Sequence, residues 1–443
     1  MSLRHKRALA AILLLLLAIP VFGIEGTSRE VLPNGMSVII KESHGSPTVS
    51  LNIFVRAGGL YETPETNGLS HFYEHMFFRG TPTRTGWQFK RAIEALGGTT
   101  NANTGRDFTH YYINLPAQYA PQGLELLADA LKNAELKPEG ADLEREAVLE
   151  EYRIGMASPT RQFYEKIFNM AFSGHPYQRS VMGPIENLQR FNRPDFVAFK
   201  QKFYVPSRTS LIVVGDVRAD ELRPHIKRLF SDFGGADAGD PQFVLPPWPA
   251  EEVAVVEGNT LNKAYVLLAF RGPSVRDRPD IYQADVMTFL LGMGRGSMLN
   301  RALVDKKLAD STSVDFLTQR EPGLIIAVAV GDGGDESKVK EGMLATIERI
   351  KKGDFTDAEL RRAKVLLTNT YTFGNETNSG KADSLGFYES IDKMDFAVKY
   401  LEEVKKVDRQ GVMRCANKYF TPGFYSLVAK PGGAGPVEEG DNQ

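Results

Sequence analysis

The second half of the chain repeats part of the first half at a constant spacing. Residues 202–213 (KFYVPSRTSLIV) align without a gap with residues 418–429 (KYFTPGFYSLVA), so each position recurs 216 residues later. Lysine, an aromatic pair, proline and a Ser-Leu step before an apolar run occur in both copies. Chance is the alternative, because helix, proline and strand often follow one another. A repeat of this length predicts two similar domains of roughly 200 residues each.

Apolar periodicity indicates an α+β fold for both domains, because strand-length and helix-length runs are interspersed. Strands are expected at 38–41, 49–56, 108–115, 211–214, 264–270 and 324–330, and helices at 69–78, 87–96, 121–133 and 141–154. The segment 236–251 is rich in Gly, Pro, Ala and Asp, as linkers are. The expected organisation is a first domain at 28–235, a linker at 236–251, a second domain at 252–432 and a flexible tail at 433–443.

The composition is that of an ordinary globular protein without a nucleic-acid partner. Lys and Arg number 53 against 55 Asp and Glu, and no long basic block occurs. Nucleic acid is therefore not the expected partner. Cys415 is the one cysteine, so packing and not an internal disulfide must stabilise the fold.

The first residues have the pattern of a secretory signal peptide. Arg4, Lys6 and Arg7 precede an apolar run at 8–22, and Gly23 follows it. A permanent membrane anchor is the weaker alternative, since a span needs about 20 apolar residues. We expect residues 1–23 to be removed, leaving a periplasmic or secreted bacterial protein with no membrane span.

Two histidines four residues apart form a candidate metal site in the stretch GLSHFYEHMFF. On a helix, His71 and His75 project from one face, and Glu74 lies beside that face without occupying it. Two imidazole nitrogens can share one zinc ion, and a neighbouring carboxylate can act as a base. The alternative is a buried helix carrying two packing histidines, because aromatic residues surround them.

A catalytic zinc site needs a third protein ligand, and the helix at 142–152 offers two candidates. Glu144 and Glu151 are seven residues apart, which is two helical turns, and so lie on one face. One could bind the metal while the other orients a histidine through its second ring nitrogen. Glu146 and Glu150 point elsewhere on this helix.

Several separated motifs resemble those of peptidase family M16, the pitrilysin and mitochondrial processing peptidase family of inverzincins. The resemblance rests on HFYEH within residues 68–81, on 96–104 followed by 107–112, on 175–177 and on 213–216. It implies two homologous domains, each an antiparallel-dominated sheet backed by helices, and zinc-dependent hydrolysis of peptides in an enclosed chamber. The residue roles that it implies are zinc binding by His71, His75 and Glu151, water activation by Glu74, support by Glu144, and substrate-strand binding by Asn101, Ala102, Asn103 and Thr104.

One departure from the family pattern concerns the second domain. Active members carry an arginine and, seven residues later, a tyrosine there. Asp305 and Asp310 stand at the aligned positions, with a short deletion between them, on a helix expected at 303–310. No tyrosine from Tyr265 onward follows an arginine at that spacing. The resemblance therefore implies a related partner subunit that supplies the pair. The alternatives are a homodimer without the pair and a non-catalytic assembly or binding subunit.

Overall fold

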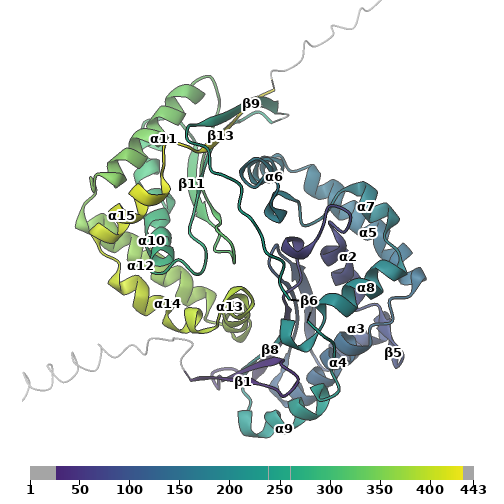
Figure 1. Ribbon diagram of the computed structural model, residues 1–443. Coiled ribbons are helices and arrows are strands. Elements are labelled where there is room, and N and C mark those ends of the chain that lie inside the picture. Colours follow the sequence, from purple (N-terminus) through teal and green to yellow (C-terminus); the bar gives the residue numbers. More distant parts are fainter. Residues whose placement is uncertain (1–25, 238, 260, 433–443) are drawn as a thin grey trace, which may run out of the picture.

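Two mixed β-sheets, each backed by helices, form the frame of the protein (Figure 1). The structure is a computed structural model that describes residues 26–237, 239–259 and 261–432. The predicted signal peptide at 1–23 and the predicted tail at 433–443 lie outside these residues. The α+β prediction is confirmed.

The two sheets share one strand order. The first runs β1 (Thr27–Val31), β2 (Ser37–Glu42), β8 (Thr209–Gly215), β3 (Thr48–Val55), β7 (Thr109–Pro116) and β6 (Thr99–Thr104). The second runs β9 (Val253–Asn259), β13 (Tyr425–Pro431), β10 (Ala264–Arg271), β12 (Leu324–Gly331) and β11 (Ser311–Phe316). Without β1, the orders coincide, and in each sheet one pair is parallel (β2 with β8, β9 with β13) while the others are antiparallel. The prediction of two homologous, antiparallel-dominated domains is confirmed.

Helices cover these sheets and carry the residues of the candidate site. The first half contains α2 (Leu69–Phe77), α3 (Gly86–Ala95), α4 (Ala120–Asn133), α5 (Pro138–Met156), α6 (Pro159–Ala171), α7 (Ile185–Arg190), α8 (Arg193–Phe203) and α9 (Ala219–Phe230). The second half contains α10 (Asp280–Gly292), α11 (Glu336–Lys351), α12 (Asp357–Gly374), α13 (Asn378–Ile391), α14 (Asp395–Lys406) and α15 (Arg409–Tyr419). No helix in the described ranges is long and apolar enough to cross a membrane.

Each half supplies one helix to the core of the other. Helix α13 of the second half packs on β3 and β8, where Leu385 joins Phe54 and Ile212 in one buried cluster. Helix α6 of the first half packs on β13 of the second sheet, and Phe163 meets Tyr265 with ring centroids 5.1 Å apart. The two halves are therefore interlocked by apolar burial and do not merely touch along a surface.

Charged contacts fix the start of the predicted linker 236–251. The guanidinium of Arg208, whose side chain is 1% exposed, lies 3.0 Å from Asp237 Oδ1 and 3.0 Å from Asp240 Oδ1. Arg320 of the second half also binds Asp240, at 2.5 Å. A buried guanidinium needs such partners, so the segment is held where it passes between the halves.

The prediction of a helix at 303–310 is wrong in its extent. A short helix ends at Val304, and Lys307 then adopts a positive φ of 60°. The amide of Leu308 donates to the carbonyl of Leu303 at 2.8 Å, which closes a turn before β11. A left-handed residue ends a helix because the next amides turn back on its last carbonyls.

Candidate metal centre

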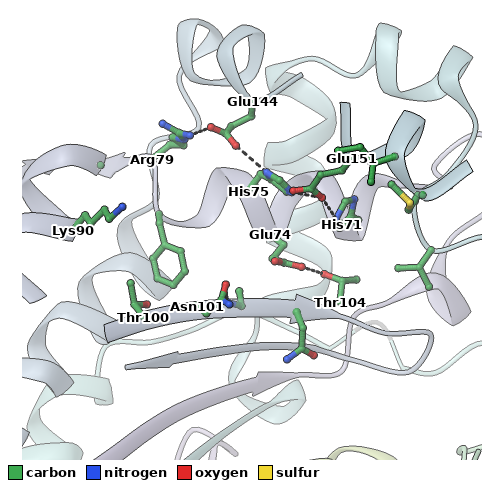
Figure 2. A pocket seen from close by; sticks show the side chains of 18 of the residues that line it. His71, Glu74, His75, Arg79, Lys90, Thr100, Asn101, Thr104, Glu144 and Glu151 are labelled. Atoms are coloured by element: carbon green, nitrogen blue, oxygen red, sulfur yellow. Dashed lines mark hydrogen bonds and ion pairs between the residues drawn. The ribbon is translucent and has the colours of Figure 1, made fainter. Parts of the chain in front are cut away.

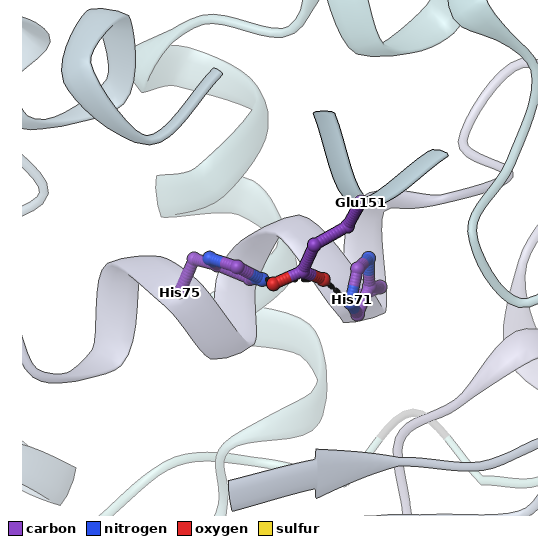
Figure 3. Close-up of side chains that lie close together, drawn as sticks. All are labelled: His71, His75 and Glu151. Carbon is purple, nitrogen blue, oxygen red and sulfur yellow. Dashed lines mark ion pairs between the residues drawn. The ribbon is translucent and has the colours of Figure 1, made fainter. Parts of the chain in front are cut away.

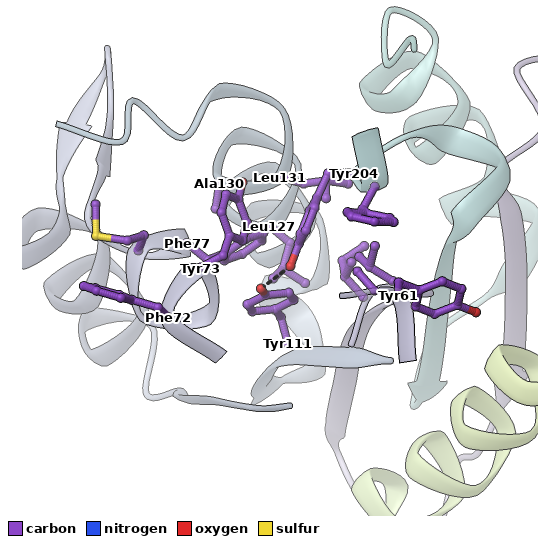
Figure 4. Close-up of a cluster of buried hydrophobic side chains, with 14 of the residues drawn as sticks. Tyr61, Phe72, Tyr73, Phe77, Tyr111, Leu127, Ala130, Leu131 and Tyr204 are labelled. Carbon is purple, nitrogen blue, oxygen red and sulfur yellow. Dashed lines mark hydrogen bonds between the residues drawn. The ribbon is translucent and has the colours of Figure 1, made fainter. Parts of the chain in front are cut away.

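Helix α2 is anchored by aromatic residues on its buried side. Phe72, Tyr73 and Phe77 are fully buried, and the ring of Phe77 stacks on that of Tyr111 with ring centroids 3.7 Å apart (Figure 4). The hydroxyls of Tyr111 and Tyr204 lie 2.5 Å apart within this cluster. Because the aromatic face is fixed, the opposite face of α2 carries its polar side chains into the cleft.

A buried carboxylate holds the start of α2. Glu62 accepts hydrogen bonds from the amide of Ser70 at 2.7 Å and from the amide of Gly68 at 3.0 Å. Gly68 has φ +96°, and a Cβ there would lie 2.7 Å from the carbonyl oxygen of Met182. The first-turn amides of a helix need acceptors, and Glu62 supplies them from outside the helix. The sequence interpretation missed this residue, which no motif marks.

Three side chains from α2 and α5 converge on one point (Figure 3). Nε2 of His71 lies 3.4 Å from Oε2 of Glu151, and Nε2 of His75 lies 3.5 Å from the same oxygen. One ligand atom from each residue lies within 4.8 Å of the other two. Atoms each 2.0–2.1 Å from one tetrahedral ion are about 3.4 Å apart, so the three residues fit a zinc ion.

The tautomer of His75 supports the same fit. Its Nδ1 lies 2.9 Å from Oε2 of Glu144, a carboxylate that can only accept, so Nδ1 carries the proton (Figure 2). In the neutral ring, Nε2 then presents a lone pair to the carboxylate of Glu151. Two lone pairs facing each other repel, and a cation between them removes the repulsion.

Glu144 is held in turn by a residue that the sequence interpretation overlooked. Its side chain is 5% exposed and forms an ion pair with Arg79, just beyond the end of α2 (Figure 2). Arg79 therefore fixes the carboxylate that fixes His75. Its position four residues after His75 was the available signal, because i and i+4 side chains lie on one face.

Glu74 faces the cleft beside the three converging ligands without joining them. Its Oε2 accepts a hydrogen bond of 2.5 Å from the hydroxyl of Thr104 on β6 (Figure 2). Burial raises the pKa of Glu74, while the Thr104 hydroxyl and the two histidines oppose that shift. A carboxyl group with a raised pKa is suited to taking up and releasing a proton.

Strand β6 forms an exposed edge of the first sheet along the cleft. It pairs with β7 on one side only, and Asn101, Ala102, Asn103 and Thr104 all line the cleft, whose volume is about 970 Å³. An edge strand leaves amides and carbonyls free to pair with another extended chain. The four residues of the predicted substrate strand therefore lie beside the candidate metal ligands.

The two aspartates at the aligned arginine and tyrosine positions lie outside this cleft. Asp305 follows the short helix in a turn, and Asp310 binds Lys263 at 2.7 Å near the start of β11. Neither lines the cleft around His71 and His75. The described part of this chain places no residue of the second half among the cleft-lining side chains.

Known proteins match this chain over most of its length. The zinc protease PqqE of Helicobacter pylori (strain ATCC 700392 / 26695) is 26% identical over 396 residues, 88% of this chain and 89% of that protein. Cytochrome b-c1 complex subunit 1, mitochondrial, of Bos taurus is 26% identical over 428 residues, 93% of this chain and 87% of that protein. A crystal structure of a protease from Helicobacter pylori has the same fold, with a TM-score of 0.85 at 24% identity, covering 91% of this chain and 99% of that one.

Two family profiles match successive parts of the chain. The profile described as insulinase (peptidase family M16) matches residues 37–185, which include α2, α5 and α6. The profile described as the peptidase M16 inactive domain matches residues 190–367. Since the two profiles together cover most of the sequence, the chain belongs to peptidase family M16.

Proposed function

We propose that the protein is a zinc-dependent metalloendopeptidase subunit that hydrolyses extended peptides. The observation that carries the proposal is the convergence of His71, His75 and Glu151 beside Glu74, at a free strand edge. Two histidines and a glutamate are a recurrent donor set for catalytic zinc, with the fourth position open. Glu144 and Arg79 would orient His75 from behind.

Zinc bound by these three residues would supply a Lewis acid that lowers the pKa of water and polarises a carbonyl group. Glu74 takes the proton from the attacking water and later gives it to the nitrogen of the leaving amine. The Thr104 hydroxyl orients the carboxylate of Glu74 during both transfers. Hydrolysis then leaves a carboxylate on one product and an amine on the other.

The substrate is an extended peptide that adds to β6. Backbone hydrogen bonds at Asn101 to Thr104 would give affinity with little dependence on sequence. The peptide would run along the edge next to Glu74, because Thr104 joins that edge to α2. This geometry suits unfolded chains and excludes folded proteins, whose backbones are already paired.

A partner subunit completes the proposed site. The chain carries Asp305 and Asp310 where the family pattern has an arginine and a tyrosine, and none of the described residues of the second half lines the cleft. We expect a related subunit to close a chamber and supply that pair, with a homodimer as the alternative. The basic and apolar start of the sequence supports assembly in a periplasm or outside the cell.

A non-catalytic assembly subunit is the second candidate function. The relative named cytochrome b-c1 complex subunit 1 supports it, since that protein is a component of a larger complex. The presence of His71, Glu74, His75 and Glu151 together supports the peptidase instead, because an assembly role needs none of them.

The deciding experiment combines zinc content with turnover. Glu74→Gln keeps the shape of the side chain and removes the base, so it should retain zinc while hydrolysis of an unstructured peptide falls at least 100-fold. Undiminished turnover in this variant would show that Glu74 is not the base. The chain is assayed alone and with a related candidate partner, and strong hydrolysis by the isolated chain would overturn the partner requirement.

A further inference from the structure

The turn between β6 and β7 lies directly after Thr104, at residues 105–108. The amide of Leu60 donates to the carbonyl of Arg106 at 2.7 Å. A Cβ on Gly58 would lie 2.7 Å from the same carbonyl oxygen, so this segment approaches the turn more closely than a larger residue would allow. The first half therefore holds the turn by direct backbone contact.

The motif His175-Pro176-Tyr177 has no part in the proposed chemistry, yet it borders this turn. Nδ1 of His175 accepts a hydrogen bond from the amide of Tyr177 at 3.1 Å, which closes the motif into a short helical turn. Tyr177 is fully buried, and its carbonyl accepts from Nε of Arg106 at 3.2 Å. The motif therefore places a buried tyrosine against the residues that follow β6.

The hydroxyl of Tyr177 links this turn to the second half of the chain. It donates to Oδ1 of Asp107 at 2.5 Å and accepts from the amide of Glu321 at 3.2 Å. Burial and the neighbouring Asp107 raise the pKa of Tyr177, so the hydroxyl keeps its proton and is the donor to the carboxylate. One oxygen atom thus joins the end of the edge strand to a segment of the second half.

Asp107 forms a second link between the same segments. Its Oδ2 accepts from the amide of Arg320 at 3.2 Å, and the residue is 5% exposed. Burial raises the pKa of Asp107, while the hydrogen bonds from Tyr177 and from the Arg320 amide oppose that shift. Each carboxyl oxygen faces a donor, which suits the ionised form. Loss of either donor would leave a buried acceptor unpaired.

These contacts lie three residues from the candidate site. Asp107 follows Thr104 by three positions, and Thr104 donates to Glu74. None of the described residues of the second half lines the metal cleft, so that half can act on the site only through such supporting contacts. The turn sets where β6 lies along α2.

Resting on the proposed peptidase function, we propose that Tyr177 and Asp107 are positioning residues that fix the register of the bound peptide against Glu74. With the turn held, β6 offers its free amides and carbonyls at one position along α2. With the turn released, β6 shifts and the peptide is displaced in steps of two residues, because a one-residue slip would send its side chains to the opposite faces. The cleaved bond then changes as well as the rate.

Tyr177→Phe tests this role, because it removes the shared hydroxyl and keeps the ring. The zinc-loaded chain, together with its partner where one is needed, cleaves one unstructured peptide, and mass spectrometry identifies the products. We expect roughly a fifth or more of the product to come from bonds two residues from the main cleavage. We expect kcat about fivefold lower, KM within about twofold and unchanged zinc content. Asp107→Asn removes the acceptor for one of the two donors and should have the same effect.

Tyr164→Phe is the matched control, because the hydroxyl of Tyr164 also bridges the two halves. It donates to Oδ2 of Asp315 at 2.7 Å, from α6 to β11, and not to the turn after β6. This variant should keep the main cleavage bond. Hydrogen exchange gives a readout without turnover: the amides of 99–108 should exchange about tenfold faster in Tyr177→Phe and at the unsubstituted rate in Tyr164→Phe.

The outcomes separate the positioning role from the peptidase function. An unchanged cleavage bond in both Tyr177→Phe and Asp107→Asn, or an equal change in Tyr164→Phe, would overturn the positioning role and leave the peptidase function intact. Faster exchange of 99–108 in Tyr177→Phe, with no peptide cleaved by any form of the protein, would support the fixing of β6 by Tyr177 and refute the peptidase function.

Discussion

The hydroxyl of Thr104 donates a hydrogen bond of 2.5 Å to the carboxylate of Glu74. This contact joins the edge strand β6 to the helix that carries His71 and His75 (Figure 2). The position of a peptide that pairs with β6 would therefore be fixed relative to the proposed base, Glu74, through the side chain of Thr104. In the proposed mechanism, this contact between residues 30 positions apart would link peptide binding to proton transfer.

Loss of this hydroxyl should slow turnover more than it weakens binding. Thr104→Val keeps the β-branched shape and removes the donor, so the carboxylate of Glu74 is no longer oriented. We expect kcat to fall about tenfold with KM within a factor of about two, as for loss of one charge-assisted hydrogen bond. Thr104→Ser is the control and should retain most activity, and a fully active Val variant would show that the hydroxyl does not orient Glu74.

Glu144 should determine metal affinity without binding the metal. Glu144→Gln replaces the charged carboxylate beside His75 Nδ1 with a neutral amide. The imidazole is then oriented less firmly, and its Nε2 donates its lone pair to the metal less strongly. Such changes behind a ligand typically cost 10–100-fold in metal affinity. Zinc competition with a chelator measures this, and Glu146→Gln on the exposed side of α5 provides the control. Equal zinc affinity in the two variants would contradict the role of Glu144.

Glu62 should matter for stability. Glu62→Ala leaves the buried amides of Gly68 and Ser70 without acceptors at the start of α2. We expect the free energy of unfolding to fall by about 2–3 kcal/mol, measured by denaturant titration. Glu65→Ala changes an exposed glutamate three residues later and should stay within about 0.5 kcal/mol of the unsubstituted protein. A loss of similar size in both variants would argue against the cap.

The repeat and the helix motifs could be predicted because both depend on local sequence. The spacing of 216 residues between 202–213 and 418–429 holds for β8 and β13, which begin at Thr209 and Tyr425, and for the helices before them. Period and turn signals also gave α2 and α3 within one or two residues. These features need no knowledge of distant contacts.

The remaining features could not be predicted because they are set by contacts between distant segments. The exchange of α6 and α13 between halves depends on which apolar faces meet, and periodicity records only that such faces exist. The support of α2 by Glu62, and the meeting of Asp107, Tyr177 and Glu321, follow from tertiary packing alone. In the same way, a lysine does not predict a positive φ, so the left-handed conformation of Lys307 could not be read from the sequence.

The stability of the second half should depend on pH through Asp285. Burial raises the pKa of this carboxyl to about 7, opposed by the hydroxyl of Tyr400, which donates to it at 2.6 Å. The folded pKa thus exceeds the unfolded value near 3.9, so its contribution to stability is complete below about pH 4 and is lost as the pH rises through 7.

Asp285→Asn removes this titration while keeping an acceptor for Tyr400. Its free energy of unfolding should vary less between pH 5 and pH 8 than that of the unsubstituted protein, by about 2–4 kcal/mol, since one pKa unit corresponds to about 1.4 kcal/mol. Denaturant titrations at both pH values measure the difference. Asp357→Asn, an exposed carboxylate paired with Arg409, should leave the slope over that range unchanged. Parallel pH profiles for Asp285→Asn and the unsubstituted chain would show that Asp285 is already ionised at pH 5, because a carboxyl that stays charged over the range contributes no slope.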